Sequence, residues 1–174
     1  MGDPESDGRR LTHLDDSGRA RMVDVGDKPV TRRRAVAEGT IRMDPETLHA
    51  IRAQELRKGD ALTVARLAAI GGAKRTPDLI PLCHPLPLDA VEVTIDEVEA
   101  SRERGGLPGL RVRVAASTWS RTGVEMEAMC GVTAGLLAVY DMAKSRDRGM
   151  RIEDVRLLEK SGGRSGRWAR DGEG

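Results

Sequence analysis

The chain has 174 residues, enough for one domain with a buried core and a short segment at either end. Hydrophobic residues make up 39% and charged residues 33%, and the net charge is only +1, which is typical of a soluble globular protein and not of a polyanion binder. With no Phe, two Trp and one Tyr, the chain lacks the stacking rings of a single-stranded nucleic-acid platform, so we expect no nucleic acid among its partners.

The cysteine count and the hydropathy pattern bear on the compartment. Two cysteines, Cys83 and Cys130, cannot supply a four-Cys zinc site, and they give no indication of an oxidising compartment. No run of about 18 apolar residues predicts a membrane span. The polar N-terminus, MGDPESDGRR, does not resemble a signal peptide. The sequence therefore predicts a cytoplasmic protein with no membrane partner.

The first predicted elements follow a polar start. Residues 1–11 are rich in Gly, Asp and Arg, and we expect them to form a disordered extension. Residues 12–34 show no clean period, which predicts an extended arm with a short strand at 20–25. The segment 33–43 is predicted to be a full strand.

Two helices are predicted next. The first spans 44–56, because Asp44 is a favourable N-cap and Pro45 suits the first helical position, and we expect it to end at Gly59. The second begins at an aspartate cap of its own and spans 60–76. It is expected to stall at a pair of glycines near its end.

The rest of the chain predicts a hairpin, a long helix and a last strand. The proline-rich segment 77–87 cannot form a regular helix. Apolar side chains alternate over 89–100 and 110–118, which predicts two half-buried strands joined as a hairpin. The longest helical pattern covers 124–149, and 151–162 is predicted to be the final strand.

The predicted order is strand, helix, helix, strand, strand, helix, strand. A β-hairpin combined with helices on one side favours a single α+β domain, with a ferredoxin-like antiparallel sheet and the helices packed on one face. We place this domain at 12–162, followed by a flexible C-terminal tail at 163–174.

The segment LIPLCHPLPLDAVEV sets a cysteine beside a histidine between prolines. Adjacent residues rarely ligate one metal ion, and sequence neighbours seldom form a nucleophile–base dyad, so Cys83 and His84 make a weak metal site and a weak catalytic pair. A plain turn and a pocket wall both remain open. The prolines favour the pocket wall, because they stiffen the backbone around two polar side chains.

Two pairs of charged residues on the predicted long helix are further candidates. Asp141 and Lys144 lie three residues apart, so they form either a surface ion pair or an acid–base couple in which partial burial moves the lysine towards neutrality. Glu125 and Glu127 near the helix N-terminus are explained by the helix dipole alone. They could also accept hydrogen bonds from N–H donors such as those of guanine.

The basic residues Arg33, Lys58, Lys74 and Arg75 come from separate segments. Each alone is a solvated charge, whereas several together would cradle phosphates. Glu127 and Asp141 are fourteen residues apart, which is roughly 21 Å along one helix. A small substrate cannot easily touch both from one chain, so we predict an active site at a subunit interface in an oligomer.

Six motifs in order carry a resemblance to a known family: LTHLDDSGRARMVDVGDKPVTRRRA, KGD, TVARLAAIGGAKRTPDLIPLCHPLPLDAVEV, TGVEMEA, YDMAK and VRLLEKSGGRSG. Together they resemble the molybdenum cofactor biosynthesis protein C family, the cyclic pyranopterin monophosphate synthases. LIPLCHPL and TGVEMEA in one chain are far more specific than a single short motif.

The resemblance implies a ferredoxin-like subunit that pairs into dimers and assembles as a hexamer, a trimer of dimers. It implies conversion of 3',8-cyclo-7,8-dihydro-GTP to cyclic pyranopterin monophosphate with release of pyrophosphate, a lyase reaction in molybdenum cofactor biosynthesis. No cofactor and no protein-only metal site are implied, although a divalent ion could accompany the substrate triphosphate.

The resemblance also implies roles for individual residues. Asp141 would be the catalytic acid or base, Lys144 its partner and Lys58 a further catalytic lysine. The implied substrate-binding residues are Leu82, Cys83, His84, Glu125, Met126, Glu127, Lys74 and Arg33. Ring opening, proton transfer and ring closure suit Asp, Lys and His near neutral pH, and the triphosphate requires cations.

The chain departs from the family pattern at a few positions. Arg121 and Arg164 stand where lysine is common, which keeps the charge and changes the donor geometry. Gly131 and Gly135 lie inside the predicted long helix, and close helix packing at an interface would explain them. None of these departures touches the catalytic candidates.

Two other functions remain as alternatives. The chain could be a non-catalytic oligomer that binds a nucleotide or a partner protein. It could also bind nucleic acid through its arginine-rich arm and tail, although the balanced charge and the scarcity of aromatic residues count against this.

Overall fold

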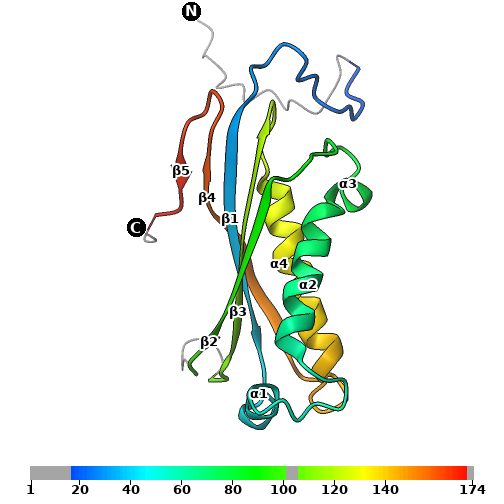
Figure 1. Cartoon of the computed structure of the whole chain (residues 1–174), viewed down its shortest axis with the longest axis vertical. Helices are drawn as coiled ribbons and strands as arrows, with labels where there is room; N and C mark the ends of the chain where they lie inside the picture. Colours follow the sequence, from blue (N-terminus) through cyan, green and yellow to red (C-terminus); the bar gives the residue numbers. More distant parts are fainter. Residues whose placement is uncertain (1–16, 101–105, 172–174) are drawn as a thin grey trace, which may run out of the picture.

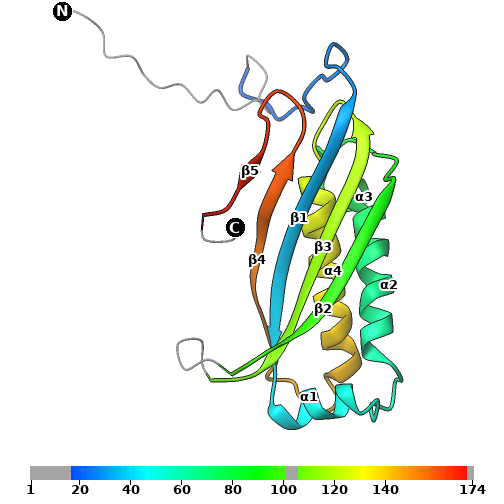
Figure 2. The ribbon, with the colours of Figure 1, turned by 60° about the vertical axis from the view of Figure 1, so that its left-hand side comes forward.

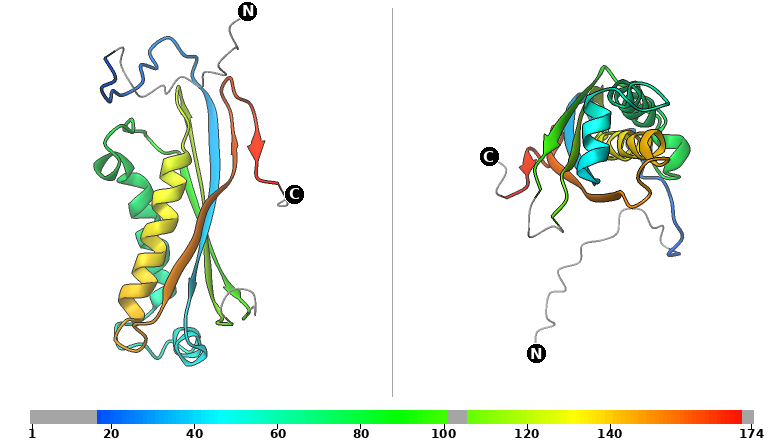
Figure 3. Two further views of the ribbon diagram at one scale, coloured as in Figure 1. Left: turned by 180° about the vertical axis from the view of Figure 1, so that it is seen from behind. Right: turned by 90° about the horizontal axis from the view of Figure 1, so that it is seen from below.

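The structure is a computed structural model, and it describes residues 17–100 and 106–171. Five strands form one antiparallel sheet in the order β2–β3–β1–β4–β5, and the helices cover one face of it (Figures 1 and 2). The views from behind and from below show the opposite face free of helices (Figure 3). The predicted α+β fold, an antiparallel sheet with helices on one face, is therefore confirmed.

The strands are β1 (Thr31–Arg42), β2 (Ala90–Val98), β3 (Gly109–Ser120), β4 (Arg151–Ser161) and β5 (Trp168–Ala169). The helices are α1 (Pro45–Arg52), α2 (Ala61–Lys74), α3 (Thr76–Leu79) and α4 (Glu125–Ala143). The predicted disordered extension at 1–11 lies outside the described residues, as do residues 101–105 of the predicted hairpin loop.

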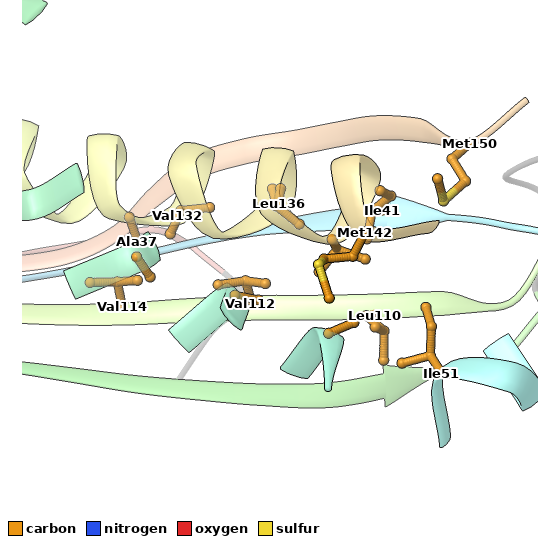
Figure 4. Packing of buried hydrophobic residues seen from close by; sticks show 14 of the residues in the cluster. Ala37, Ile41, Ile51, Leu110, Val112, Val114, Val132, Leu136, Met142 and Met150 are labelled. Atoms are coloured by element: carbon orange, nitrogen blue, oxygen red, sulfur yellow. The ribbon is translucent and has the colours of Figure 1, made fainter. Parts of the chain in front are cut away.

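The core lies between the sheet and the pair α2 and α4, and the central strand β1 lets α4 come close. Ala37 and Ile41 of β1 are fully buried and face Val132 and Leu136 of α4 (Figure 4). A Cβ placed on Gly39 would lie 2.8 Å from Leu136 Cδ1, nearer than a real contact allows. Small residues on β1 therefore fix α4 across the sheet, which sets the direction of the helix that carries most candidate site residues.

The glycines of α4 pack within the chain. A Cβ on Gly131 would lie 3.1 Å from the Ala69 carbonyl oxygen of α2, and one on Gly135 would lie 3.2 Å from Val112 Cγ1 of β3. On α2, a Cβ on Gly72 would lie 2.5 Å from the Ala134 Cβ. These contacts account for Gly72, Gly131 and Gly135 without a subunit interface, and the packing of Gly72 against α4 accompanies the continuation of α2 to Lys74.

Several predicted boundaries are wrong. The segment 20–25 forms no strand and has only an isolated bridge at Ala20. The first helix ends at Arg52, and Asp44 occupies its N-cap position without a side-chain hydrogen bond to the helix. By contrast, the second helix has the expected type of cap, since the Asp60 side chain accepts hydrogen bonds from the backbone N–H groups of Leu62 and Thr63.

The long helix ends at Ala143, earlier than predicted. Asp147 stops it from continuing, because its carboxylate accepts hydrogen bonds from the backbone N–H groups of Asp44 (3.0 Å) and Gly149 (2.8 Å) and so ties the turn to the start of α1. α4 is long and apolar enough to cross a membrane by length and composition, but 56% of its most apolar window is buried inside the chain. Its apolar character is thus that of a core helix.

Candidate active site

A cavity of about 540 Å³ opens at the N-terminal end of α4. Its walls come from the arm before β1, the proline-rich segment after α3, and the turn that leads into α4. The lining residues are Val23, Val25, Lys28, Ile80, Leu82, Cys83, His84, Leu86, Thr122, Gly123, Glu125, Met126 and Glu127. The structure therefore brings together six of the eight predicted substrate-binding residues. We refer to this cavity as the pocket.

The proline-rich segment between α3 and β2 forms one wall of the pocket. After the single turn of α3, the Cys83 N–H donates to the Ile80 carbonyl oxygen at 3.0 Å, and the chain then continues to β2 without helix or strand. The Thr118 hydroxyl donates to the Pro87 carbonyl oxygen at 2.6 Å and fastens the end of the segment to β3. Cys83 and His84 are therefore held between two anchored points.

The local environment of Cys83 argues against nucleophilic chemistry. Burial raises the pKa of its thiol, and the nearby Glu127 carboxylate and the Cys130 thiol raise it further. A thiol in such surroundings stays protonated near neutral pH, whereas a nucleophile or metal ligand must be a thiolate. Among residues 17–100 and 106–171, no three His, Cys, Asp or Glu side chains gather as a metal site.

The two glutamates at the start of α4 differ in environment. Glu127 is only 3% exposed, and burial raises its pKa to about 7. Glu125 is half-buried and pairs with Lys160 of β4 at 3.2 Å. One carboxyl group is therefore close to half-protonated at neutral pH, while its neighbour is matched with a cation. Such a split is typical of sites that both donate and accept protons.

Lys160 was not among the residues singled out from the sequence. It pairs in register with Ala35 of β1, whose side chain belongs to the core, so Lys160 points to the helix side of the sheet and reaches Glu125. The alternation of residues in a strand does not tell which residues of the neighbouring strand lie opposite. The sequence therefore could not predict that Lys160 reaches Glu125.

A second cavity of about 490 Å³ adjoins the pocket and shares Lys28, Thr122 and Gly123 with it. It is strongly cationic, and we call it the basic cavity. Its charged lining residues are Lys28, Arg33, Arg121 and Arg164. The two positions that depart from the family pattern, Arg121 and Arg164, thus lie beside the predicted binding residue Arg33.

Arg33 is held in place by the backbone. Its Nε and Nη2 donate to the carbonyl oxygens of Ser120 and Arg121, both at 3.2 Å. A Cβ on Gly163 would lie 2.6 Å from Arg33 Cζ, so the glycine turn after β4 leaves room for the guanidinium group. Lys74, the last residue of α2, is exposed and lines neither the pocket nor the basic cavity.

The three predicted catalytic residues meet at the other end of α4. Lys58 Nζ lies 2.6 Å from Asp141 Oδ2, and Lys144 Nζ lies 2.7 Å from Asp141 Oδ1. Lys58 Nζ also donates to the Asp141 carbonyl oxygen at 2.8 Å. All three side chains are about half exposed. We call this group the triad.

The triad differs electrostatically from what the sequence predicted. Hydrogen bonds from Lys144 and Lys58 lower the pKa of Asp141 to about 2, and the hydrogen bond to Asp141 raises the pKa of Lys144. The expectation that burial moves Lys144 towards neutrality is therefore wrong for the single chain, because the side chain is exposed and its nearest partner is an anion. Here the triad is one carboxylate held between two ammonium groups.

The pocket and the triad lie at opposite ends of α4, which runs from Glu125 to Ala143. The fourteen residues between Glu127 and Asp141 span roughly 21 Å of straight helix. One end is concave and largely apolar, and the other is open to solvent and charged. A single chain therefore presents two separate halves of the predicted site.

Comparison with known proteins gives consistent matches over most of the chain. The model of the MoaC family matches residues 22–163. A protein of Methylobacterium sp. (strain 4-46), named cyclic pyranopterin monophosphate synthase, is 56% identical over 161 residues, which cover 92% of this chain and 97% of that protein. A protein of Brucella ovis with the same name is 55% identical over 160 residues, or 92% of this chain and 93% of that protein.

Proposed function

The chain belongs to the MoaC family, and from this premise we propose that it is a cyclic pyranopterin monophosphate synthase of molybdenum cofactor biosynthesis. Its substrate would be 3',8-cyclo-7,8-dihydro-GTP, and its products the cyclic monophosphate and pyrophosphate. The observation that carries this proposal is the placement of the family's pocket motifs, LIPLCHPL and TGVEMEA, around one cavity beside a group of four cations. The chain would act in the cytoplasm, without nucleic-acid or membrane partners.

The ring system and the phosphates call for different surroundings, and the two adjoining cavities differ in that way. In the pocket, Leu82 and Met126 offer apolar contacts, while His84, Glu125 and Glu127 offer polar groups to the nitrogen edge of a purine-like ring. In the basic cavity, Arg33 and its neighbours would neutralise the triphosphate and then the leaving pyrophosphate. Lys74 would add charge only if the substrate or a neighbouring chain reached it.

The chemistry requires protons to be moved during ring opening and ring closure. In the triad, Asp141 orients two protonated lysines, so Lys144 or Lys58 would donate a proton and Asp141 would hold the donor in place. Contact with a neighbouring chain would exclude water from the triad and strengthen these interactions. No cofactor is needed for these steps, and a divalent ion would enter only with the triphosphate.

We infer that the triad of one chain completes the pocket of another. A strip of exposed side chains links the two ends of α4, including Met126 (38% exposed) and Leu137 (55%), and α2 adds Leu67 (66%). A second chain packed here about a two-fold axis would exchange the two ends of α4, so each copy would supply its triad to the other. Three such pairs would give the expected hexamer.

The test is turnover of the cyclised GTP intermediate by the purified protein. We expect pyrophosphate and the pterin product to form together, and both to disappear in Lys144→Ala and Asp141→Ala with folding intact. Binding of the intermediate without pyrophosphate release would instead support a non-catalytic binding protein. Full turnover by both variants would overturn the assignment of the triad.

A further inference from the structure

Gly123 lies in the turn that leads into α4, where the pocket and the basic cavity share a wall. Unlike Gly162 and Gly163, it does not have a positive φ angle. Any L-residue could therefore adopt its backbone conformation, and the turn itself does not require glycine here. The reason for a glycine must lie in what surrounds its Cα atom.

The neighbour of Gly123 is the side chain of Glu125. The atom nearest to a Cβ built on Gly123 would be Glu125 Oε2, followed by Cδ at 2.7 Å and Oε1 at 2.9 Å. Real Cβ atoms essentially never come within 3.0 Å of another heavy atom. The Glu125 carboxylate therefore folds back over the chain into the space that a side chain at position 123 would fill.

This position of the carboxylate determines its partner. Glu125 Oε1 lies 3.2 Å from Lys160 Nζ of β4, and Lys160 Nζ also lies 3.3 Å from the Ser165 hydroxyl in the segment that follows the glycine turn. The bare Cα of Gly123 thus permits a link from the first turn of α4 to the strand and loop that border the basic cavity.

We propose that Gly123 is a positioning residue, whose missing side chain lets Glu125 meet Lys160 and hold both groups at the junction of the two cavities. The proposal rests on the proposed function only in that Glu125 is taken to contact the substrate. A methyl group at position 123 would leave the backbone unstrained and displace the carboxylate, because the contact is with the far end of a flexible side chain.

The test compares Gly123→Ala with Glu125→Ala, the double variant, and Gly71→Ala as a matched control. Gly71 lies in α2 with no atom near its virtual Cβ, so its substitution also adds a methyl but meets nothing. We expect Gly123→Ala to fold and to lose on the order of 10-fold to 100-fold in kcat/KM, as misplaced site groups do. In the Glu125→Ala background the same substitution should change kcat/KM less than about twofold.

A second readout does not depend on activity. The side-chain amine signal of Lys160, followed by nitrogen NMR in lysine-labelled protein, should shift in Gly123→Ala as it does in Glu125→Ala, and stay unchanged in Gly71→Ala. An unshifted Lys160 signal in Gly123→Ala would overturn the positioning role. A shifted signal with wild-type kcat/KM would leave the positioning intact and overturn the use of Glu125 in the proposed reaction.

Discussion

The two ends of α4 carry acidic side chains with opposite electrostatic behaviour. At the N-terminal end, Glu127 is buried and its pKa rises to about 7. At the C-terminal end, Asp141 is exposed between two lysines, and its pKa falls to about 2. The helix is one continuous element, so the difference comes from what surrounds each end. One carboxyl group is suited to exchange protons near neutral pH, and the other is suited to hold cations.

The largest expected effect comes from removing the anion of the triad. Asp141→Asn keeps the side-chain shape and withdraws the charge that holds Lys58 and Lys144 together. We expect kcat to fall about a thousandfold, within the range for loss of acid–base groups, while the circular dichroism spectrum stays that of the native protein. Glu97→Gln, which breaks the exposed pair of Glu97 with Arg52, is the matched control and should leave kcat unchanged. Equal losses in both variants would mean that the triad has no special role.

The next largest effect is on the pH dependence of stability, through Glu127 at the buried N-terminal end of α4. Because the folded-state pKa of Glu127 is raised, the protonated form favours folding, and that stability is lost as pH rises from about 4.5 towards 7 and above. Glu127→Gln does not titrate, so relative to the native chain it should gain up to about 3 kcal/mol in free energy of unfolding between about pH 4 and about pH 8. Urea unfolding at the two pH values measures this. Glu125→Gln is the control. If Glu125→Gln gained as much free energy of unfolding over this pH range as Glu127→Gln, the two glutamates would not differ in environment as described.

The smallest expected effect is on stability at the exposed end. The double variant Lys58→Met/Lys144→Met removes both ion pairs of the triad, yet exposed pairs contribute little to folding. We expect an unchanged urea midpoint at neutral pH and loss of turnover. Because solvent screens the exposed triad, the lowered pKa of Asp141 contributes only a little stability, which is present above the ordinary aspartate pKa and lost as pH falls towards 2. A large drop of the urea midpoint at neutral pH would show that the triad mainly stabilises the fold.

The sequence predicted the order of the main elements and the fold class from the alternation in the strands and the long helical patterns, although of the two predicted aspartate caps only Asp60 forms its side-chain hydrogen bonds. The family resemblance implied eight substrate-binding residues, and six of them line the pocket, whereas Arg33 lines the basic cavity and Lys74 lines neither. The residues of LIPLCHPL and TGVEMEA alone do not show that the two motifs meet in space. The sequence did not predict where α4 ends or that α2 continues through its glycines, because tertiary contacts determine both. The turn after α4 is held by the Asp147 carboxylate, which accepts a hydrogen bond from the Asp44 backbone N–H, and Gly72 packs against Ala134 in α4.

The electrostatics of the site also lay beyond the sequence. The spacing of Asp141 and Lys144 indicated a pair, but Lys58 joins them from a loop eighty-three residues earlier. The pairing of Glu125 with Lys160 depends on strand register, and the buried state of Glu127 depends on packing. Hydrophobic periodicity reports which face of an element is buried, and it carries no information on which charged groups meet.

The comparison of the two ends of α4 leads to one claim, that a working site combines the triad of one chain with the pocket of another. Co-expression of Asp141→Asn and His84→Ala chains with different tags, followed by tandem purification of mixed assemblies, tests it most directly. Each variant alone should be nearly inactive, whereas random mixing of two chain types should leave about a quarter of the sites with both halves intact and restore about a quarter of wild-type kcat. Mixed assemblies no more active than either variant alone would contradict the claim.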